Sequence, residues 1–238
     1  MSLKGKKILL IGGSSFIGLH LCKRLLAFGS DVSILCRNHE KTINIGFIKK
    51  AKIVRGDITN YDSVEENIKN KDVIINLAAV VNSGNDFYPY EDLEVNCKGQ
   101  INVLEARKNA NPKSKYICFG TRAQFGKVNQ KDLPIREDYC QRPLSLYGVH
   151  KQTAENYCLL YRRAFDIKSI VVRMPQVYGP SLTKEETNSL IDKFIRKAMK
   201  NEVFFVNGYG GDIKDAIYID DLIDLLIKIL NSNREEGI

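Results

Sequence analysis

Long hydrophobic runs are missing from this chain. It has 238 residues, 44% of them hydrophobic, which is enough to build the core of one large domain. No apolar stretch approaches the roughly 20 residues that a membrane-spanning helix needs. The apolar run 8–11 ends at two glycines and is too short for the core of a signal peptide. We therefore expect a cytoplasmic protein.

Histidine is scarce, and cysteine pairs are lacking. The chain has three histidines, none spaced as a metal-binding pair, and six cysteines without a Cys-x-x-Cys motif. The sequence thus predicts no metal site and cysteines that are reduced, buried and apolar in character. The net charge of +8 is spread along the chain. We expect a solvated basic surface, with no nucleic-acid partner.

Short apolar strands alternate with helical patterns. Strands are predicted at 7–11, 32–36, 52–55, 73–77, 116–119 and 169–173, and helices after the first strand and at 61–70, 93–109 and 147–165. This alternation is typical of an α/β fold with a doubly wound parallel sheet. Further on, we expect a strand at 203–206, a turn at 208–211, and a helix at 222–230 capped by Asp220 or Asp221.

Glycines cluster directly after the first predicted strand. Sheets of this kind bind ligands beyond the carboxyl ends of their strands, and glycine there permits a tight turn and a close approach to a pyrophosphate. Phosphate would rest on the N-terminus of the next helix. We predict that a dinucleotide contacts Gly12, Gly13, Ser14, Ser15, Phe16, Ile17 and Gly18.

The ends of the second and third strands bear on which dinucleotide binds. The second strand is followed by Arg37, with no acidic residue to accept ribose hydroxyl groups. An arginine suits a 2′-phosphate, so NADP is favoured over NAD. Asp57, after the third strand, either meets the adenine or caps the next helix.

Tyr147 and Lys151 lie four residues apart at the start of a predicted helix. This spacing places them on the same helical face. A free tyrosine has a pKa of about 10, and a nearby ammonium group is one of the few ways to bring it close to neutrality. Tyr147 would then serve as a general base or acid. A surface tyrosine followed by a helical lysine has the same spacing, so this pattern alone leaves both interpretations open.

Five motifs occur in the order of a known family. They are Gly12-Gly13-x-x-Phe16-Ile17-Gly18, Asn76-Leu77-Ala78-Ala79, Tyr147-x-x-x-Lys151, Arg173-Met-Pro-Gln-Val-Tyr178-Gly179-Pro180, and Lys214-Asp215-Ala-Ile-Tyr218-Ile-Asp220-Asp221-Leu222. Together they resemble the extended short-chain dehydrogenase/reductases of the nucleotide-sugar epimerase/dehydratase branch. The resemblance spans nearly the whole chain and implies a Rossmann-type sheet with a small C-terminal substrate lobe.

The resemblance also implies site residues. Thr121 would hydrogen-bond the sugar oxygen while Tyr147 takes or returns its proton, and Lys151 would hold the nicotinamide ribose and lower the pKa of the tyrosine. Further cofactor contacts are implied at Arg37, Asp57, Ile58, Leu77, Ala78, Ala79 and Pro175. Substrate contacts are implied at Thr121, Gln124, Gln176 and Lys214.

Some residues depart from the family pattern. Ser15 stands at a usual glycine, where it would narrow the room for the pyrophosphate or add a hydroxyl contact. Lys214 stands at a frequent arginine and supplies a point charge. We interpret His150 as a helix-surface residue. Arg122 and Ala123 follow Thr121 where dehydratases and decarboxylases of the family have an acidic residue, which disfavours 4,6-dehydration.

We therefore expect an NAD(P)-dependent epimerase that transiently oxidises the sugar 4-position. The alternatives are an NADPH-dependent 4-keto-sugar reductase, which Arg37 would suit, and a cofactor-binding regulator without activity. Residues 1–173 would form the dinucleotide-binding domain, to which 212–231 return, and 174–238 an incomplete substrate lobe. The resemblance further implies a homodimer formed through helices 93–109 and 147–165.

Overall fold

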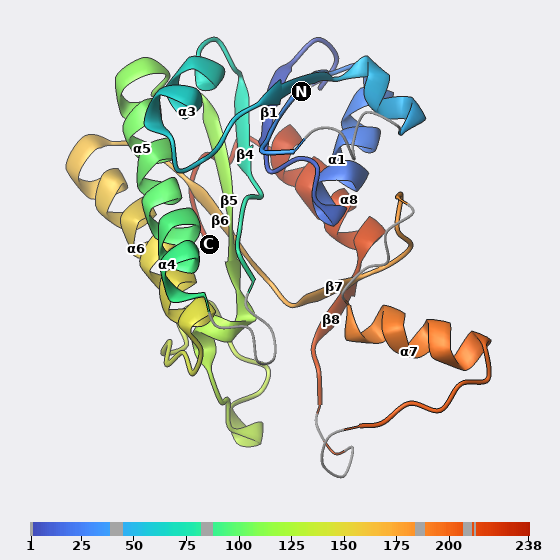
Figure 1. The fold of residues 1–238 in the computed structure, drawn as a ribbon. Helices are drawn as coiled ribbons and strands as arrows, with labels where there is room; N and C mark the ends of the chain where they lie inside the picture. The colour runs from blue at the N-terminus through green and yellow to red at the C-terminus, as the bar shows by residue number, and fades with distance from the viewer. Residues whose placement is uncertain (1, 39–44, 82–87, 184–188, 207–210, 212) are drawn as a thin grey trace.

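A six-stranded parallel sheet forms the centre of the protein. The computed structural model describes residues 2–38, 45–81, 88–183, 189–206, 211 and 213–238. The sheet consists of β1 (Lys7–Ile11), β2 (Asp31–Cys36), β3 (Lys52–Arg55), β4 (Val73–Asn76), β5 (Lys115–Thr121) and β6 (Ile170–Met174). Their order is β3-β2-β1-β4-β5-β6 (Figure 1). This is the Rossmann strand order, so the predicted fold class is confirmed.

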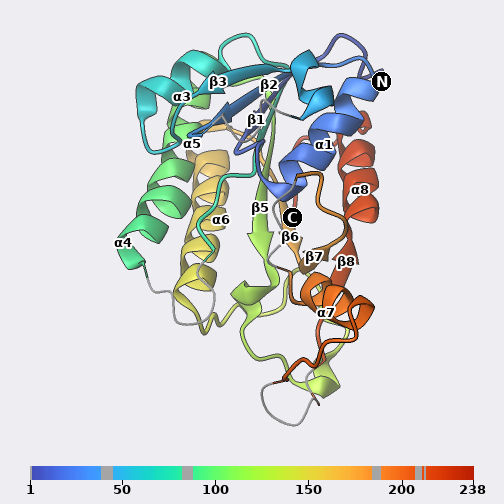
Figure 2. The same cartoon turned by 45° about the vertical axis from the view of Figure 1, so that its right-hand side comes forward.

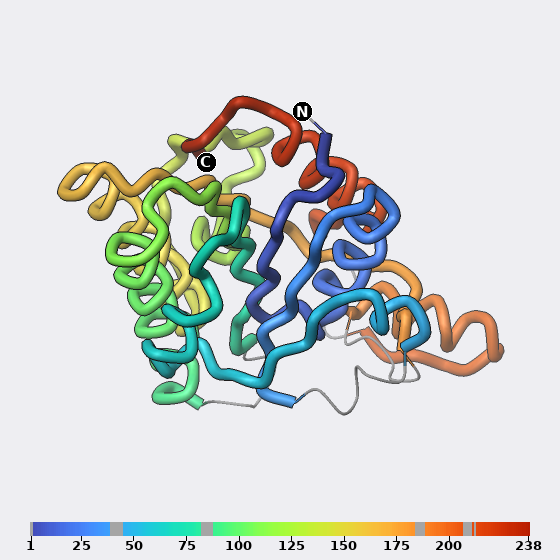
Figure 3. Tube along the Cα trace, turned by 90° about the horizontal axis from the view of Figure 1, so that it is seen from above, coloured from blue at the N-terminus to red at the C-terminus, as the bar shows by residue number. Residues whose placement is uncertain are grey.

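Helices cover both faces of the sheet (Figure 3). One face carries α1 (Phe16–Ala27) and α8 (Ile219–Asn231), and the other carries α3 (Tyr61–Ile68), α5 (Gly99–Ala110) and α6 (Leu146–Phe165). Four of the five residues of β1 are buried, and all four of β4. This double burial explains why the strands appear in the sequence as continuous apolar runs.

Side-chain caps fix where several helices begin. Ser15, Asn60 and Ser145 each accept a hydrogen bond from the backbone amide three residues on, at 3.2, 2.9 and 3.1 Å. Such caps contribute about 1 kcal/mol each. Asn60, and not Asp57, therefore starts the helix after β3. The helix α6, which begins after Ser145, ends at Asp166, whose backbone is left-handed with φ 57°.

A smaller part lies beyond the carboxyl edge of the sheet (Figure 2). It contains the parallel strands β7 (Gln176–Tyr178) and β8 (Ala216–Tyr218) and the helix α7 (Leu190–Met199). After β8 the chain returns as α8, where Leu222 and Leu226 pack in one core with Ile8 and Leu10 of β1. Among the described residues, none of the helices has the length and apolar character that crossing a bilayer would take.

Several predicted elements need correction. The strand predicted at 203–206 does not form, because this segment pairs with no other strand. The turn predicted at 208–211 falls mostly outside the described residues. The last helix begins at Ile219, so Asp220 and Asp221 lie in its first turn and interact with the helix dipole without capping it. The predicted helix 93–109 begins with the π-helical turn η2 (Leu93–Lys98).

Four short helical segments were missed by the sequence patterns. They are η1 (Gly46–Lys50), α4 (Pro89–Asp92), η3 (Arg122–Phe125) and η4 (Gln130–Asp132). Each has at most five residues, which is too short for a periodic apolar face. Two of them, α4 and η3, nevertheless lie against α6 and help to build the site described next.

Candidate active site

The turn after β1 is packed tightly against the turn after β4. Gly12 has φ +73°, and a Cβ atom at this position would lie 2.7 Å from the backbone nitrogen of Ala78. A Cβ atom on Gly18 would lie 2.6 Å from Cα of Gly13, so α1 also packs directly on the loop. Only glycine fits at Gly12 and Gly18, and the loop backbone is thereby held at the carboxyl edge of the sheet.

Ser15 shapes the helix end that a phosphate would meet. Its hydroxyl accepts the amide hydrogen of Gly18 at 3.2 Å and so forms the N-cap of α1. The first-turn amides of Phe16 and Ile17 have no partner within the helix, as at any helix start. This arrangement fits the pyrophosphate of a dinucleotide. The Ser14 hydroxyl hydrogen-bonds the thiol of Cys36 at the end of β2.

The residues expected near the adenosine ribose have partners of their own. Arg37 Nη1 lies 3.6 Å from Glu91 Oε1, and both side chains are exposed. Asp57 Oδ1 accepts hydrogen bonds from the backbone nitrogen and the hydroxyl of Thr59, both at 2.9 Å, and stiffens the turn after β3. The neighbouring Ile58 is buried, so only its backbone faces that edge.

The segment after β4 is fixed from both sides. Leu77 donates its amide hydrogen to the Ile11 carbonyl at 2.8 Å, and the Asn76 side chain accepts from the Ala78 amide at 3.1 Å. Leu77, Ala78 and Ala79 thus run alongside the glycine turn, as predicted for a cofactor-binding segment. A dinucleotide would lie across these two turns, where the strand order reverses.

Thr121 and Tyr147 come from elements in direct contact. Thr121 ends β5, and η3 follows it. A Cβ atom on Gly148 would lie 2.7 Å from the Ala123 carbonyl oxygen, so the first turn of α6 rests on η3. Lys151 follows one helical turn after Tyr147 and is buried. The structure therefore brings all three predicted catalytic residues to the same edge of the sheet. Pro175, directly after β6, lies at that edge too.

The electrostatics of Tyr147 are governed mainly by its burial. Burial, with a further contribution from the Asp92 carboxylate, raises the pKa of Tyr147 to about 12. Burial also lowers the pKa of Lys151, against the opposing influence of Cys118, Cys158 and Asp92. In the protein by itself, desolvation of the phenol therefore dominates the pKa of Tyr147, and the lowering expected from Lys151 stays a prediction.

Gln124 does not face the substrate side, contrary to the prediction. It is fully buried, and its Oε1 accepts the backbone amide hydrogen of Thr121 at 2.7 Å. Its Nε2 donates to Glu155 at 2.9 Å and to Gln141 at 3.1 Å. Glu155 in turn accepts a 2.9 Å hydrogen bond from Nε of Arg173. Gln124 therefore positions the threonine through a buried polar network.

His150 is not a helix-surface residue. It is 9% exposed, and its Nδ1 lies 2.8 Å from Oδ1 of Asp92, a carboxylate with no exposure at all. Asp92 escaped the sequence analysis because nothing in its local pattern marks it as buried. The signal that could have found the pair is a histidine three residues after Tyr147, on the inward face of the same predicted helix.

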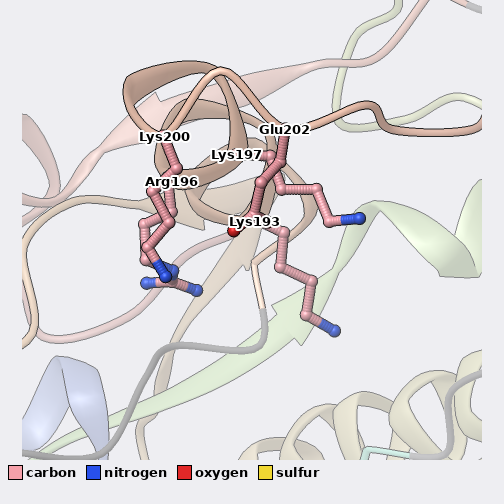
Figure 4. Close-up of a pocket in the computed structure, with 5 residues that line it drawn as sticks. All are labelled: Lys193, Arg196, Lys197, Lys200 and Glu202. Carbon is pink, nitrogen blue, oxygen red and sulfur yellow. The ribbon is translucent and has the colours of Figure 1, made fainter.

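The substrate side is built around β7, β8 and α7. Gln176 begins β7 and donates its amide hydrogen to the Asp215 carbonyl at 3.3 Å, which brings it beside the exposed Lys214. A cavity of about 290 Å³ lies between the small sheet and α7, lined by Tyr178, Gly179, Pro180, Ser181, Asp192, Ile195, Arg196 and Tyr218. A second one of about 270 Å³ is lined by Lys193, Arg196, Lys197, Lys200 and Glu202 (Figure 4). This end of the molecule is strongly basic.

The cysteines are all free, and five of the six are buried, with Cys140 exposed. In the part of the chain that the structure describes, no three potential ligand residues gather into a metal site. The residues assembled at the sheet edge are compatible with a dinucleotide-binding enzyme.

Comparison with known proteins agrees with this class. Residues 8–238 match the NAD dependent epimerase/dehydratase family. The chain belongs to this family and is an NAD(P)-dependent enzyme of the extended short-chain dehydrogenase/reductase type. It is 32% identical over 233 residues to a candidate UDP-glucose 4-epimerase of Methanocaldococcus jannaschii, a match covering 96% of this chain and 74% of that protein.

Two further relatives show the breadth of the family. The crystal structure of UDP-glucuronic acid 4-epimerase from Bacillus cereus, in complex with UDP-glucuronic acid and NAD, superimposes with a TM-score of 0.81 at 28% identity. The superposition covers 96% of this chain and 74% of that one. A dTDP-D-glucose 4,6-dehydratase of Dictyostelium discoideum is 28% identical, covering 94% of this chain and 55% of that protein. Because the family includes both epimerases and dehydratases, family membership does not determine which reaction is catalysed. That question depends on the residues of the site.

Proposed function

We propose that this protein is a nucleotide-sugar 4-epimerase that acts by transient oxidation at C4 of the sugar. The observation that carries the proposal is the contact of Gly148 with the Ala123 carbonyl, which places Thr121 and Tyr147 on touching elements beside the dinucleotide turns. In the proposed reaction Thr121 holds the C4 oxygen, and Tyr147 takes the hydroxyl proton and later returns it.

The cofactor would supply the redox step. When bound, the dinucleotide accepts hydrogen with its electron pair from C4 and returns it to the opposite face of the ring. The protein's own residues hold the cofactor through the Gly12 turn, orient its ribose through Lys151, and exchange the proton through Tyr147. Because the pKa of Tyr147 is about 12 in the protein alone, the tyrosine would ionise only when a positive charge is brought beside it.

The reaction outcome is proposed from the residues after Thr121. Arg122 and Ala123 provide no carboxylate there, whereas eliminating water requires both a base and an acid at the sugar. This supports epimerisation over 4,6-dehydration. The basic end of the molecule, with Arg196 lining the cavity at β7 and β8 and Lys214 just before β8, supports a substrate with a nucleoside diphosphate.

The alternative is an NADPH-dependent 4-keto-sugar reductase, supported by the position of Arg37 after β2. The exposed pair of Arg37 with Glu91 opposes it, because Glu91 would repel a 2′-phosphate. We also retain as proposals the homodimer through α5 and α6, the cytoplasmic location, and the division into a dinucleotide-binding domain and a substrate lobe.

The test is to incubate the protein with UDP-glucose, UDP-glucuronic acid and UDP-N-acetylglucosamine in D₂O, without a reductant. The expected result is conversion of at least one substrate to its C4 epimer with no deuterium incorporated, followed by NMR. Deuterium at C5 of a 4-keto-6-deoxy product would indicate dehydration. Consumption of NADPH by a 4-keto nucleotide sugar, with no epimer from any of the three hexoses, would establish the reductase and overturn the proposal.

A further inference from the structure

A fully buried carboxylate lies against the catalytic helix. Asp92 is the last residue of α4, where the chain passes into the π-helical turn η2, and it has no exposed surface. Its Oδ1 accepts a hydrogen bond from Asn96 Nδ2 at 2.5 Å and lies 2.8 Å from His150 Nδ1. Burying a carboxylate costs free energy even when it is hydrogen-bonded, and an apolar side chain of similar volume often stabilises a fold as well. Stability alone therefore does not explain a carboxylate at this position.

Asp92 is connected to the cofactor side through Asn96. The Asn96 amide bonds both backbone groups of Val80, accepting from its nitrogen at 3.2 Å and donating to its oxygen at 2.8 Å. Val80 follows the cofactor-binding segment at the end of β4. On the other side, the Cys97 thiol donates to the His150 carbonyl oxygen at 3.6 Å. Asp92 thus joins the cofactor turn to the first turns of α6.

Several groups of the described residues face the Asp92 carboxylate or feel its charge. His150 and Asn96 contact it directly, and its charge acts on Tyr147 and Lys151 of α6 and on Cys97 of η2. The carboxylate raises the pKa of the tyrosine and of the thiol, in each case after burial as the larger cause. It also opposes the loss of the proton from the lysine. The Nδ1–H group of His150 can donate this hydrogen bond to the Asp92 carboxylate.

We propose that Asp92 is a positioning residue for the catalytic pair: its carboxylate, fully buried and fixed by His150 and Asn96, holds a negative charge beside the first turns of α6, where Tyr147 and Lys151 lie. The inference deepens the proposed function, on which it rests. The Asp92 charge opposes the desolvation that lowers the pKa of Lys151, beside the larger influence of Cys118 and Cys158. The tyrosine keeps its proton until the cofactor charge arrives, which limits proton loss to the loaded enzyme.

The inference is tested on the NAD⁺ complex by following the Cζ signals of ¹³C-labelled tyrosine through a pH titration, with Tyr147→Phe to assign the Tyr147 signal. In Asp92→Asn, which keeps the shape and removes the charge, the titration midpoint of Tyr147 should fall by about one pH unit. His150→Asn is the matched control, because an asparagine amide can reach the position of Nδ1 and donate to Asp92. Its midpoint should stay within about 0.3 of the wild type.

An unchanged midpoint in Asp92→Asn would overturn the inference, and so would an equal shift in His150→Asn, which would assign the effect to the histidine. Near-ultraviolet circular dichroism checks that each variant is folded. If Asp92→Asn fails to fold, Asp92→Ser replaces it with the same expected shift. No sugar is used, so the titration succeeds or fails independently of the epimerase assay. Where turnover is measurable, the acidic limb of kcat/KM should move to lower pH in Asp92→Asn, which a merely structural residue would not cause.

Discussion

The side-chain oxygen of the fully buried Gln124 accepts the backbone amide hydrogen of Thr121 at 2.7 Å. This bond fixes the end of β5, and the same glutamine donates to Glu155 on the catalytic helix. One buried side chain thus sets the position of the threonine relative to α6. The orientation of the threonine hydroxyl therefore depends on a residue that never reaches the substrate.

Replacing Gln124 by leucine should reduce both stability and activity. The variant leaves the Thr121 amide without its partner and Glu155 Oε2 with Arg173 as its remaining donor, and an unpaired buried polar group costs about 1–3 kcal/mol. Urea unfolding and kcat measure the two effects. The control is Gln141→Leu, since Gln141 donates to Glu155 at 3.0 Å but does not contact Thr121. If the control lowers kcat as much as Gln124→Leu, positioning of the threonine is not the cause.

Removing the Tyr147 hydroxyl should abolish turnover without unfolding the protein. Tyr147→Phe keeps the ring but loses the proton-transfer group, and general acid–base groups contribute about 10²–10⁴-fold in rate. We expect kcat to fall at least about 100-fold, with NAD affinity and Tm nearly unchanged. Tyr157→Phe, on the same helix, serves as control and should keep full activity. Turnover of Tyr147→Phe at the wild-type rate would exclude the tyrosine as proton-transfer group.

Glu91→Gln should shift the cofactor preference towards NADP. Glu91 Oε1 lies 3.6 Å from Arg37 Nη1, and both groups are exposed. Removing the carboxylate frees the guanidinium for a 2′-phosphate and removes a repulsive charge. Because exposed ion pairs are worth about 0.2–1 kcal/mol, the ratio of NADP to NAD affinity should rise by about 1.5- to 5-fold in calorimetric titration. In Arg37→Ala/Glu91→Gln the gain should disappear. An equal gain in the double variant would show that Arg37 does not bind the phosphate.

Glu155→Gln should flatten the acid dependence of stability. Burial by itself would raise the pKa of Glu155, but hydrogen bonds from Arg173, Gln124 and Gln141 lower it. A carboxyl with a lowered pKa stabilises the fold fully above the ordinary pKa of about 4.3, and the contribution is lost as the pH falls through its lowered value. Urea unfolding between pH 3 and 7 should therefore show a weaker loss in the variant.

At pH 7 the same variant leaves Arg173 as an uncompensated buried charge, which costs about 3–5 kcal/mol. The matched control is Glu94→Gln, in the exposed pair with Lys98, where we expect a loss of about 0.5 kcal/mol or less. Similar losses in the two variants at pH 7 would show that the Glu155–Arg173 pair is not a buried ion pair in solution.

The sheet could be predicted from the sequence because its strands are buried on both faces. Strands β1 and β3 have the predicted bounds, and the other four deviate by at most two residues at either end. The glycine turn and the spacing of Tyr147 and Lys151 could be predicted for another reason. Both depend on local backbone geometry, which a short stretch of sequence determines. The segment 203–206 shows the limit, since its apolar run Val-Phe-Phe-Val pairs with no described strand.

The polar network of the site could not be predicted, because it joins residues far apart in the sequence. Gln124, at a position typical of substrate contacts, is held by Glu155 from another helix, 31 positions away. His150 meets Asp92 across 58 positions. Whether a polar side chain points to solvent or to such a partner depends on packing between helices, which local patterns do not encode. The burial that raises the pKa of Tyr147 depends on the same packing.

The position of α8 determines when the hydrophobic core around β1 can be completed during translation. Its residues Leu222 and Leu226 share one hydrophobic core with Ile8 and Leu10, so the core around the first strand is completed only by a helix made more than 200 positions later. At about 5–20 residues per second, that interval lasts on the order of ten seconds or more. During it, one apolar face of the nascent sheet stays open to solvent, and chaperones that bind such surfaces would have their best access to this enzyme then.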